Sequence, residues 1–350
     1  MIPHSRPSVD KKDIEAVSGV IRTGQIAQGP EVEKFEKTLA SYIRVKGAVA
    51  LSSGTSALHL SLLCLGIKEG DEVIIPSYTC SALLNSVMAT GAVPRFADIE
   101  RETYNIDPYI VEDYLRKRRK SRVRAIIVVH SFGQPADIDA FLYISDKYNI
   151  PVIEDSAQAL GATYKGRMVG SYGLVSILSF YATKVITTGE GGMIISDSSD
   201  IIKKAKDIRE YDEKESFKLR YNYKMTDMAA ALGLSQLKRL PSFIKRREEI
   251  ARIYDTTLKR DERRGKGIYY RYILETSHLE RFIRLMEKDG ISCRRPVFKP
   301  LHYYTGEKGY HNTQLSWKRS ISIPIYPGLT GKEIRKISDS LKRYKELITW

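Results

Sequence analysis

Short apolar runs alternate with amphipathic, helix-length segments between residues 45 and 210. Each run has the length and the β-branched content of a buried strand. The expected strands are Gly47–Leu51, Glu72–Ile75, Val93–Ala97, Arg124–Val129, Pro151–Ile153, Val175–Ser179 and Met193–Ser196. Because strands separated by helical crossovers pair in parallel, the pattern predicts an α/β fold with a mostly parallel sheet flanked by helices on both faces.

The segments between the strands carry apolar residues at helical spacing. They predict the helices Ala57–Leu65, Cys80–Ala89, Asp107–Lys117 and Asp137–Tyr148. An additional pair, Val9–Thr23 and Pro30–Ile43, precedes the first strand and is separated by a loop that contains Gly24 and Gly29. These two are expected to be amino-terminal helices packed beside the sheet.

The pattern changes after Met225. Helices are predicted for Met225–Arg239, Pro241–Lys259, His278–Lys288 and Gly331–Leu347, with strand-like segments at Ile268–Leu274 and Ile291–Arg295. The last hundred or so residues have the size of a small domain. We therefore expect a large α/β domain over residues 1–240 and a smaller α+β domain over residues 241–350.

Composition is that of an ordinary soluble protein, with 42% hydrophobic and 28% charged residues in 350. The apolar runs are too short to cross a bilayer, and the segment Met1–Arg6 has no signal-peptide core, so we expect a cytoplasmic protein with no membrane partner. The cysteines Cys64, Cys80 and Cys293 lack the spacing of a disulfide framework or a zinc site, so no metal is expected.

The formal net charge of +15 raises the possibility of a nucleic-acid partner. The excess lies in three clusters, Arg116–Arg124, Lys245–Arg247 and Lys259–Lys266. No zinc finger, RNP pattern or recognition helix accompanies them. We therefore interpret the clusters as a solvated basic surface with some attraction for phosphorylated substrates, and expect no nucleic-acid partner.

Lys184 stands apart from most of the other lysines because its neighbours are apolar or hydroxyl-bearing. It follows the strand Val175–Ser179 and precedes the glycine-rich segment Gly189–Gly192. A lysine in such surroundings is costly to keep protonated, which makes its amine a usable nucleophile toward a carbonyl group. The alternative is a lysine at a strand end that reaches out to water.

Asp155 ends the predicted strand at Pro151–Ile153. Ligands of open α/β sheets bind at the carboxyl ends of parallel strands, so Asp155 and Lys184 could face one ligand. An amine and a carboxylate aimed at two ends of a ligand suit pyridoxal phosphate, because the carboxylate keeps the ring nitrogen protonated. The alternative for Asp155 is a helix cap.

A small-residue turn, Ser52–Ser56, joins a predicted strand to a predicted helix. This arrangement offers free backbone amides and a helix dipole to a phosphate group. A plain connection capped by Ser53 or Thr55 is the alternative.

Six motifs in order resemble those of the DegT/DnrJ/EryC1/StrS-type nucleotide-sugar aminotransferases. They are Ser53–Leu58, Gly70–Thr79, Glu154–Gln158, Ser179–Lys184, Gly189–Gly192 and Tyr221–Met225. Members of that family are pyridoxal-phosphate enzymes of the aspartate aminotransferase fold, fold type I. The resemblance extends from Gly24 to Pro327, which is nearly the whole chain.

The resemblance implies a role for each matching residue. Lys184 would be the Schiff-base lysine and the acid/base that moves the substrate proton, and Asp155 would pair with the pyridine nitrogen. Gln158 would lie near the ring and its phenolic oxygen. The phosphate would be held by Gly54, Thr55 and Ser179.

In the family, the residue matching Asn222 reaches the phosphate of the partner subunit, which implies a homodimer with a shared active site. Tyr78, Lys224 and His302 are the expected substrate-side residues, with a surface-loop histidine as the alternative for His302.

Two positions depart from the family pattern. Cys80 stands where many relatives have an aromatic residue that stacks on the cofactor ring, so the ring would be covered by Tyr78 or by a smaller side chain. Lys224 stands where relatives often have arginine, which removes a bidentate contact.

The implied activity is a ping-pong transfer of an amino group from an amino acid, glutamate by resemblance, to a keto group of a nucleotide-activated sugar. A branch of the family replaces the lysine with histidine and carries out dehydration, and Lys184 argues against that branch. The alternatives are another pyridoxal-phosphate reaction, such as a lyase or dehydratase, and a non-enzymatic regulator.

Overall fold

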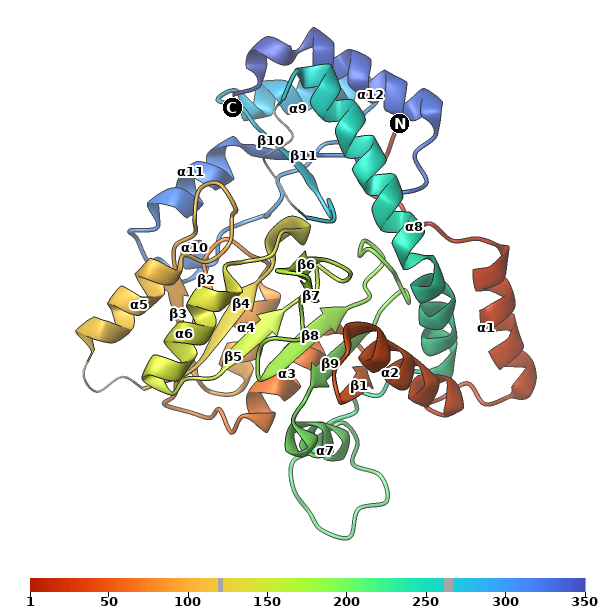
Figure 1. The fold of residues 1–350 in the computed structure, drawn as a ribbon, viewed down its shortest axis with the longest axis vertical. Helices are drawn as coiled ribbons and strands as arrows, with labels where there is room; N and C mark the ends of the chain where they lie inside the picture. Colours follow the sequence, from red (N-terminus) through yellow and green to blue (C-terminus); the bar gives the residue numbers. More distant parts are fainter. Residues whose placement is uncertain (119–121, 261–266, 350) are drawn as a thin grey trace.

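A seven-stranded sheet forms the centre of the computed structural model, which describes residues 1–118, 122–260 and 267–349 (Figure 1). The strand order is β1-β9-β8-β5-β4-β2-β3. The strands are β1 (Gly47–Leu51), β2 (Glu72–Pro76), β3 (Val93–Ala97), β4 (Val123–Val129), β5 (Val152–Asp155), β8 (Val175–Ser179) and β9 (Gly192–Ser196). All seven predicted strands are therefore present.

Strand β9 runs antiparallel to both of its neighbours, β1 and β8, whereas the pairs from β8 to β3 are parallel. The prediction of a mostly parallel sheet is confirmed. Asp155 at the end of β5 pairs in register with Ile177 of β8. The carboxyl ends of β5 and β8 consequently lie side by side.

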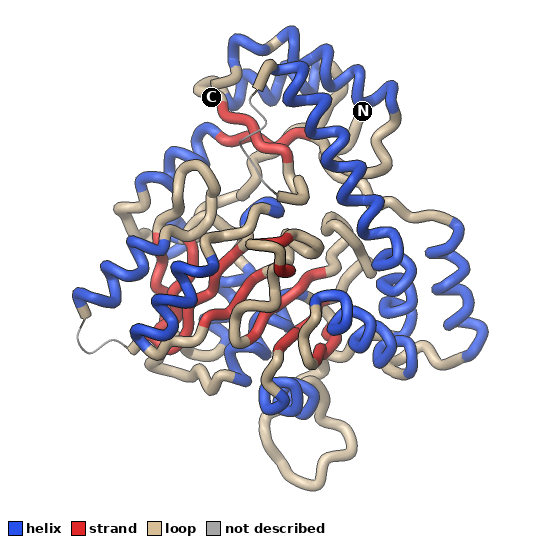
Figure 2. Tube along the Cα trace, in the orientation of Figure 1, coloured by secondary structure: helices blue, strands red, loops and turns tan. Residues whose placement is uncertain are grey.

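Helices cover both faces of the sheet, as the red strands between blue helices in Figure 2 show. Strand β4 shows how the sequence produces the two cores, because its successive side chains point to opposite faces. Ala125 and Ile127 join one core cluster, and Ile126 and Val128 join another. The first cluster includes α3 (Gly54–Cys64) and α4 (Ala82–Ala89), and the second includes α5 (Pro108–Lys117) and α6 (Ile138–Tyr148).

The amino-terminal helices α1 (Lys11–Thr23) and α2 (Pro30–Ile43) both pack against α8 (Asp227–Leu258). The buried carboxylate of Asp227, in the first turn of α8, accepts hydrogen bonds from the amides of Gly29, Glu31 and Val32. A carboxylate at these amides satisfies donors that have no partner within a helix. The beginnings of α2 and α8 are thus joined.

Helix α8 (Asp227–Leu258) is continuous over 32 residues, so the prediction of separate helices on either side of residue 240 is wrong. Pro241 lies inside α8 on its exposed side. Proline removes one helical hydrogen bond, but buried residues on both sides of it, from Leu237 to Ile250, keep the two halves packed as one helix. The division at residue 240 stays a prediction, and α8 crosses it.

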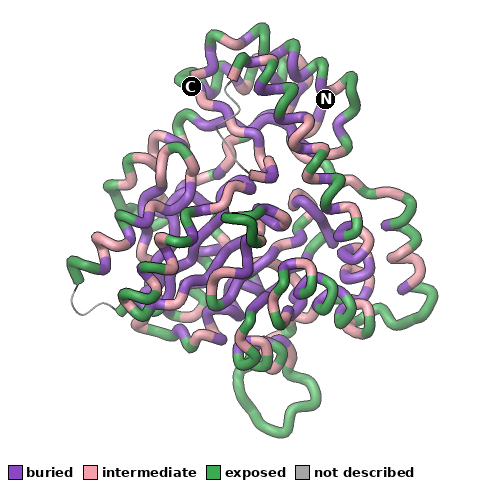
Figure 3. Tube along the Cα trace, in the orientation of Figure 1, coloured by how far each residue is buried: buried purple, intermediate pink, exposed green. Residues whose placement is uncertain are grey.

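The end of α8 packs in a separate core with the last part of the chain. There, β10 (Tyr272–Glu275) and β11 (Ser320–Ile323) form an antiparallel pair with α9 (Leu279–Lys288) and α12 (Gly331–Arg343). Ile2 belongs to this core and forms a parallel bridge with Ile291, far along the chain. Figure 3 shows that the buried residues of this second core, like the buried residues of the central sheet, are surrounded by exposed residues.

Several elements differ from the sequence prediction. The expected strand Ile291–Arg295 has only isolated bridges, at Ile291 and Arg294. The structure adds elements that the pattern did not predict, namely α7 (Ser199–Ile208), α10 (His302–Thr305), α11 (His311–Arg319), β6 (Thr163–Tyr164), β7 (Arg167–Met168), β11, η1 (Ser131–Gly133) and η2 (Lys345–Leu347).

The basic clusters are only partly described, because residues 119–121 and 261–266 lie outside the described ranges. The sequence analysis predicted that Arg247 belongs to a solvated surface, and for this residue the prediction is wrong. It is 3% exposed, and its Nη1 donates to the carbonyls of Tyr269, Tyr270 and Ile325. Within the described ranges, no helix is both long enough and apolar enough to span a membrane.

Candidate active site

Lys184 and Asp155 converge at the carboxyl ends of β8 and β5, as the strand-end argument predicted. The Asp155 carboxylate is buried, and the Ala157 amide donates to it over 3.0 Å. Burial raises the pKa of Asp155, and the positive charge of Lys184 acts against this rise. A buried carboxylate with one amide donor would be stabilised by a cationic N–H partner, which is what a protonated pyridine ring offers.

The segment after β8 holds Lys184 in place through backbone hydrogen bonds. The Lys184 amide donates to the carbonyl of Tyr181 over 2.8 Å, and the Thr188 amide returns to the carbonyl of Phe180 over 2.9 Å. The Lys184 Nζ lies 5.4 Å from the centre of the Tyr270 ring. Lys184 therefore does not extend into open water, which was its alternative interpretation.

Gly54, Thr55 and Ser179 meet where the amino terminus of α3 reaches the end of β8. A Cβ atom at Gly54 would lie 2.8 Å from Ser179 Cβ and 3.0 Å from Ser179 Oγ. The Ser53 hydroxyl accepts from the Ser56 amide, so it does not cap the first two amides of α3. Two helix amides beside a hydroxyl form a cradle that fits a phosphate.

Gln158 follows the turn after β5, and its Oε1 accepts a hydrogen bond from the Phe132 amide over 2.9 Å. This bond ties the Gln158 side chain to η1 (Ser131–Gly133), which follows β4. The predicted cofactor residues of this chain, Asp155, Gln158, Lys184 and the cradle, thus come from neighbouring strand ends. Together they fit the ring, the amine-reactive group and the phosphate of pyridoxal phosphate.

Cys80, rather than Tyr78, faces this arrangement. The Cys80 thiol interacts electrostatically with both Lys184 and Asp155. Cys80 is exposed to solvent, yet partial burial raises the pKa of its thiol. The thiol therefore lies in a recess that is open to solvent. Tyr78 is 1% exposed and packs against Tyr104 and Phe132. Of the two expected covers for the cofactor ring, the structure therefore favours the smaller side chain, Cys80, over Tyr78.

The segment between α7 and α8 projects as a long loop below the sheet in Figure 1. Asn222 is exposed near the end of this segment. Lys224 forms ion pairs with Asp212 and Glu210, and it bridges to Leu51 at the end of β1. Neither residue contacts Lys184 or Asp155 in any recorded hydrogen bond or ion pair among the described residues.

His302 is fully buried, so the surface-loop interpretation is wrong. Its Nδ1 lies 2.6 Å from Ser77 Oγ, its ring stacks on Tyr310, and burial lowers its pKa. Its Nε2 has no hydrogen-bond partner among the described residues. His302 thereby ties α10 to Ser77 in the segment after β2, next to Tyr78 and three residues before Cys80.

Sequence reasoning missed two features of the site. The carboxylate of Glu154, next to Asp155, is fully buried and accepts several hydrogen bonds, one of them from His130 Nε2 over 3.1 Å. The Ala136 amide donates to His130 Nδ1, so Nε2 carries the proton. Tyr270 is the second feature, and no local signal distinguished it from an ordinary core aromatic.

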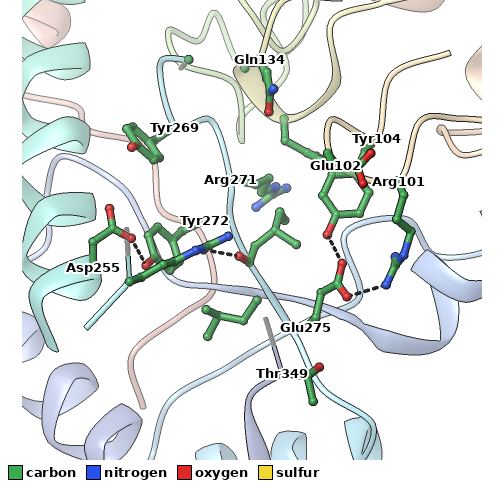
Figure 4. Close-up of a pocket in the computed structure, with 16 residues that line it drawn as sticks. Arg101, Glu102, Tyr104, Gln134, Asp255, Tyr269, Arg271, Tyr272, Glu275 and Thr349 are labelled. Atoms are coloured by element: carbon green, nitrogen blue, oxygen red, sulfur yellow. Dashed lines mark hydrogen bonds and ion pairs between the residues drawn. The ribbon is translucent and has the colours of Figure 1, made fainter. Parts of the chain in front are cut away.

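A cavity of about 400 Å³ lies beside this arrangement, between the η1 loop and the strand β10 region (Figure 4). Gln134, Tyr269 and Arg271 contribute to its lining, whereas Lys184, Asp155 and Tyr270 are not among the described residues that do. The cavity is therefore separate from the lysine–carboxylate pair.

Comparison with known proteins agrees with this geometry. Residues 7–342 match the model of the DegT/DnrJ/EryC1/StrS aminotransferase family. The GDP-perosamine synthase of Vibrio cholerae is 34% identical over 368 residues, which cover 98% of this chain and 99% of that protein.

Two solved structures are similar over nearly their full length. PseC of Helicobacter pylori, an aminotransferase of pseudaminic acid biosynthesis, has a TM-score of 0.90 and 28% identity, covering 99% of both chains. Spr1654 of Streptococcus pneumoniae, named as a sugar aminotransferase and solved in a PLP form, has a TM-score of 0.89 and 27% identity, covering 99% of this chain and 98% of that one.

Proposed function

Since the chain belongs to the DegT/DnrJ/EryC1/StrS aminotransferase family, whose enzymes depend on pyridoxal phosphate, we propose that it transfers an amino group from an amino acid to a keto group of a nucleotide-activated sugar. The observation that carries the proposal is the convergence of Lys184 and Asp155 beside the Gly54–Ser179 cradle. Glutamate is the proposed donor, and the cytoplasm is the proposed location.

The residues of this chain divide the work between binding and proton transfer. Gly54, Thr55 and Ser179 would bind the phosphate, and Asp155 would accept a hydrogen bond from the N–H of the ring nitrogen. When bound, pyridoxal phosphate supplies the electron sink that stabilises negative charge at the substrate carbon. Lys184, once freed, would be the acid/base that moves the proton between the substrate carbon and the cofactor.

The basic character of the chain supports a phosphorylated substrate. A net charge of +15 attracts a nucleotide diphosphate and raises its local concentration at the surface. The names of two relatives, a GDP-perosamine synthase and a UDP-4-amino-4,6-dideoxy-N-acetyl-beta-L-altrosamine transaminase, both contain a nucleotide-linked sugar.

A homodimer with shared active sites is part of the proposal. The loop that leads to Asn222 exposes Tyr211, Phe217 and Leu219, and Phe217 is 100% exposed. Apolar side chains that project from a monomer are typical of an interface. Asn222 would then reach the phosphate cradle of the partner subunit.

The test is reductive trapping followed by mass spectrometry. Wild-type protein is loaded with pyridoxal phosphate, treated with borohydride and digested, with Lys184→Ala and Lys224→Ala as matched variants. We expect the added pyridoxyl mass on the peptide that contains Lys184, in wild type and Lys224→Ala only. Glutamate added before borohydride should prevent the labelling. Labelling of another lysine would refute the assignment of Lys184.

A mixing experiment tests the shared site. Lys184→Ala and Asn222→Ala homodimers should each be inactive or nearly so, and subunit exchange should restore about a quarter of wild-type activity, because half of the dimers are hybrids and each has one intact site of two. No recovery in mixtures that are shown to exchange subunits would contradict a contribution from the partner.

A further inference from the structure

Asn222 lies between two tyrosines whose rings stack on each other. The ring centres of Tyr221 and Tyr223 are 4.9 Å apart, and the ring planes differ by 10°. Both side chains are partly buried against the core cluster that includes α3, whereas Asn222 between them is exposed. This alternation is that of an extended segment, in which successive side chains point to opposite sides. Burial of the two rings therefore directs Asn222 outward.

The backbone around Tyr223 is fixed on two sides. The Tyr223 amide donates to the Arg209 carbonyl over 3.0 Å, at the carboxyl end of α7, and the Tyr223 carbonyl accepts from the Ser52 amide over 2.8 Å. Lys224 forms an antiparallel bridge with Leu51 at the end of β1. The segment therefore lies between α7 and β1, beside the turn that begins at Ser52.

His59 anchors the two stacked rings to α3. The centre of its ring lies 5.1 Å from that of Tyr221, at an interplanar angle of 77°, and 6.1 Å from that of Tyr223. Its Nδ1 lies 3.2 Å from the hydroxyl oxygen of Tyr223. His59 is 6% exposed, and its Nε2 has no hydrogen-bond partner among the described residues. Within the described ranges, the Tyr223 hydroxyl is thus the one recorded polar partner of this buried ring.

His59 also belongs to the helix that contributes to the phosphate cradle. It follows Thr55 by four residues in α3, and residues at this spacing share one face of a helix. The first turn of α3 presents its amides to the cradle, and the next turn contacts the segment that carries Asn222. One rigid helix therefore connects the two features.

We propose that His59 is a positioning residue for Asn222: through Tyr221 and Tyr223 it fixes the segment from which Asn222 reaches the phosphate cradle of the partner subunit. The inference rests on the proposed function, because it takes the shared active site as its premise. His59 then supports cofactor binding in the partner subunit, although it lies on the helix that binds the cofactor of its own subunit.

A purely structural role of His59 would have a different effect. As a buried residue of α3 it would support the packing of its own subunit, and its loss would weaken the cradle of that subunit. Positioning of Asn222 predicts a loss across the interface instead. His59→Phe removes the ring nitrogens and keeps a ring. Tyr223→Phe removes the other end of the same hydrogen bond and keeps the stacked pair.

The experiment uses three hybrid dimers, purified through two different tags, in which only one subunit has Lys184. The reference pairs wild type with Lys184→Ala. The trans hybrid pairs wild type with a subunit that carries both Lys184→Ala and His59→Phe, so the working site receives Asn222 from the altered subunit. The cis hybrid pairs His59→Phe with Lys184→Ala, so the working site receives Asn222 from a subunit with an intact His59.

Borohydride trapping at increasing pyridoxal phosphate concentration measures the affinity of the working site. The trans hybrid should need about 3 to 10 times more pyridoxal phosphate than the reference for half-maximal labelling, as expected for the loss of one hydrogen bond to the phosphate. The cis hybrid should match the reference. Tyr223→Phe in place of His59→Phe should give the same loss in trans. Tyr109→Phe is the control, because this tyrosine is 81% exposed and its hydroxyl has no recorded partner among the described residues.

The outcome separates this inference from the proposed function. If the affinity loss in the cis hybrid equals or exceeds the loss in the trans hybrid, His59 does not act through Asn222 and the inference is overturned, while labelling of Lys184 still supports the proposed function. If the reference hybrid takes no label on Lys184, the proposed function fails and the inference fails with it.

Discussion

Replacing Glu154 by glutamine should strongly destabilise the fold, although it removes only a charge from a buried side chain. The carboxylate accepts five hydrogen bonds and is fully buried. The donors are the amides of Gly170 (2.8 Å), Tyr172 (2.7 Å) and Gly173 (2.6 Å), the hydroxyl of Ser176 (3.2 Å) and His130 Nε2 (3.1 Å). A glutamine has one oxygen and one NH2 group in place of the two oxygens.

The geometry determines the magnitude. In either amide orientation the NH2 group faces at least two buried donors, because each carboxylate oxygen accepts at least two. Moving the His130 proton to Nδ1 only transfers the conflict to the Ala136 amide. Since a buried donor without a partner costs about 1 to 3 kcal/mol, the free energy of unfolding should fall by about 2 to 6 kcal/mol.

Urea unfolding followed by circular dichroism at fixed protein concentration measures this loss. Ser176→Ala is the control, because it removes a single donor and should cost about 1 kcal/mol. If Glu154→Gln costs no more than Ser176→Ala, the reasoning is refuted.

The loss should also depend on pH. Burial would raise the pKa of Glu154, but His130 and the amides of Gly173 and Gly170 lower it below the ordinary value of 4.5. A lowered pKa contributes stability that is present above the ordinary value and is lost as the pH falls through the folded-state value. The difference between wild type and Glu154→Gln should therefore shrink below about pH 4.5.

Three further predictions test the scaffold and the recess. Asp227→Ala removes the acceptor of three amides at the start of α2 and should lower the free energy of unfolding by about 2 to 4 kcal/mol, measured by urea unfolding. Gly192→Ala places a Cβ 2.1 Å from the Ser53 carbonyl oxygen and should weaken pyridoxal phosphate binding in equilibrium titration, because the Ser52–Ser56 turn must move; unchanged affinity would contradict the close packing. Cys80, the exposed cysteine, should be alkylated by iodoacetamide more slowly than a free thiol at neutral pH because its pKa is raised, and added pyridoxal phosphate should protect it; mass spectrometry measures both.

The sequence pattern predicted the parts of the fold that depend on local periodicity. The bounds of β1, β8 and α2 agree with the prediction at both ends. The convergence of Asp155 and Lys184 was also predictable, because parallel strands bring their carboxyl ends to the same edge. This rule uses only the order of strands and the residue at each end.

Contacts between distant segments could not be predicted in this way. Thr183 and Tyr270 are 87 residues apart, and nothing in the sequence around Tyr270 indicates that its ring faces a lysine. Pro241 misled the prediction because local chemistry favours a helix end there, whereas tertiary packing keeps α8 continuous. The exposure of His302 was mispredicted because whether a loop residue is buried depends on which distant segments cover it.

The bridge between Ile2 and Ile291 has a consequence for folding during synthesis on the ribosome. The Ile2 amide donates to the Gly290 carbonyl, and the Ser292 amide donates to the Ile2 carbonyl. Ile2 cannot reach its final place until nearly 290 later residues have been translated. At about 5 to 20 residues per second this takes about 15 to 60 seconds. Throughout that time the segment around Ile2 lacks this pairing and remains available to chaperones and proteases.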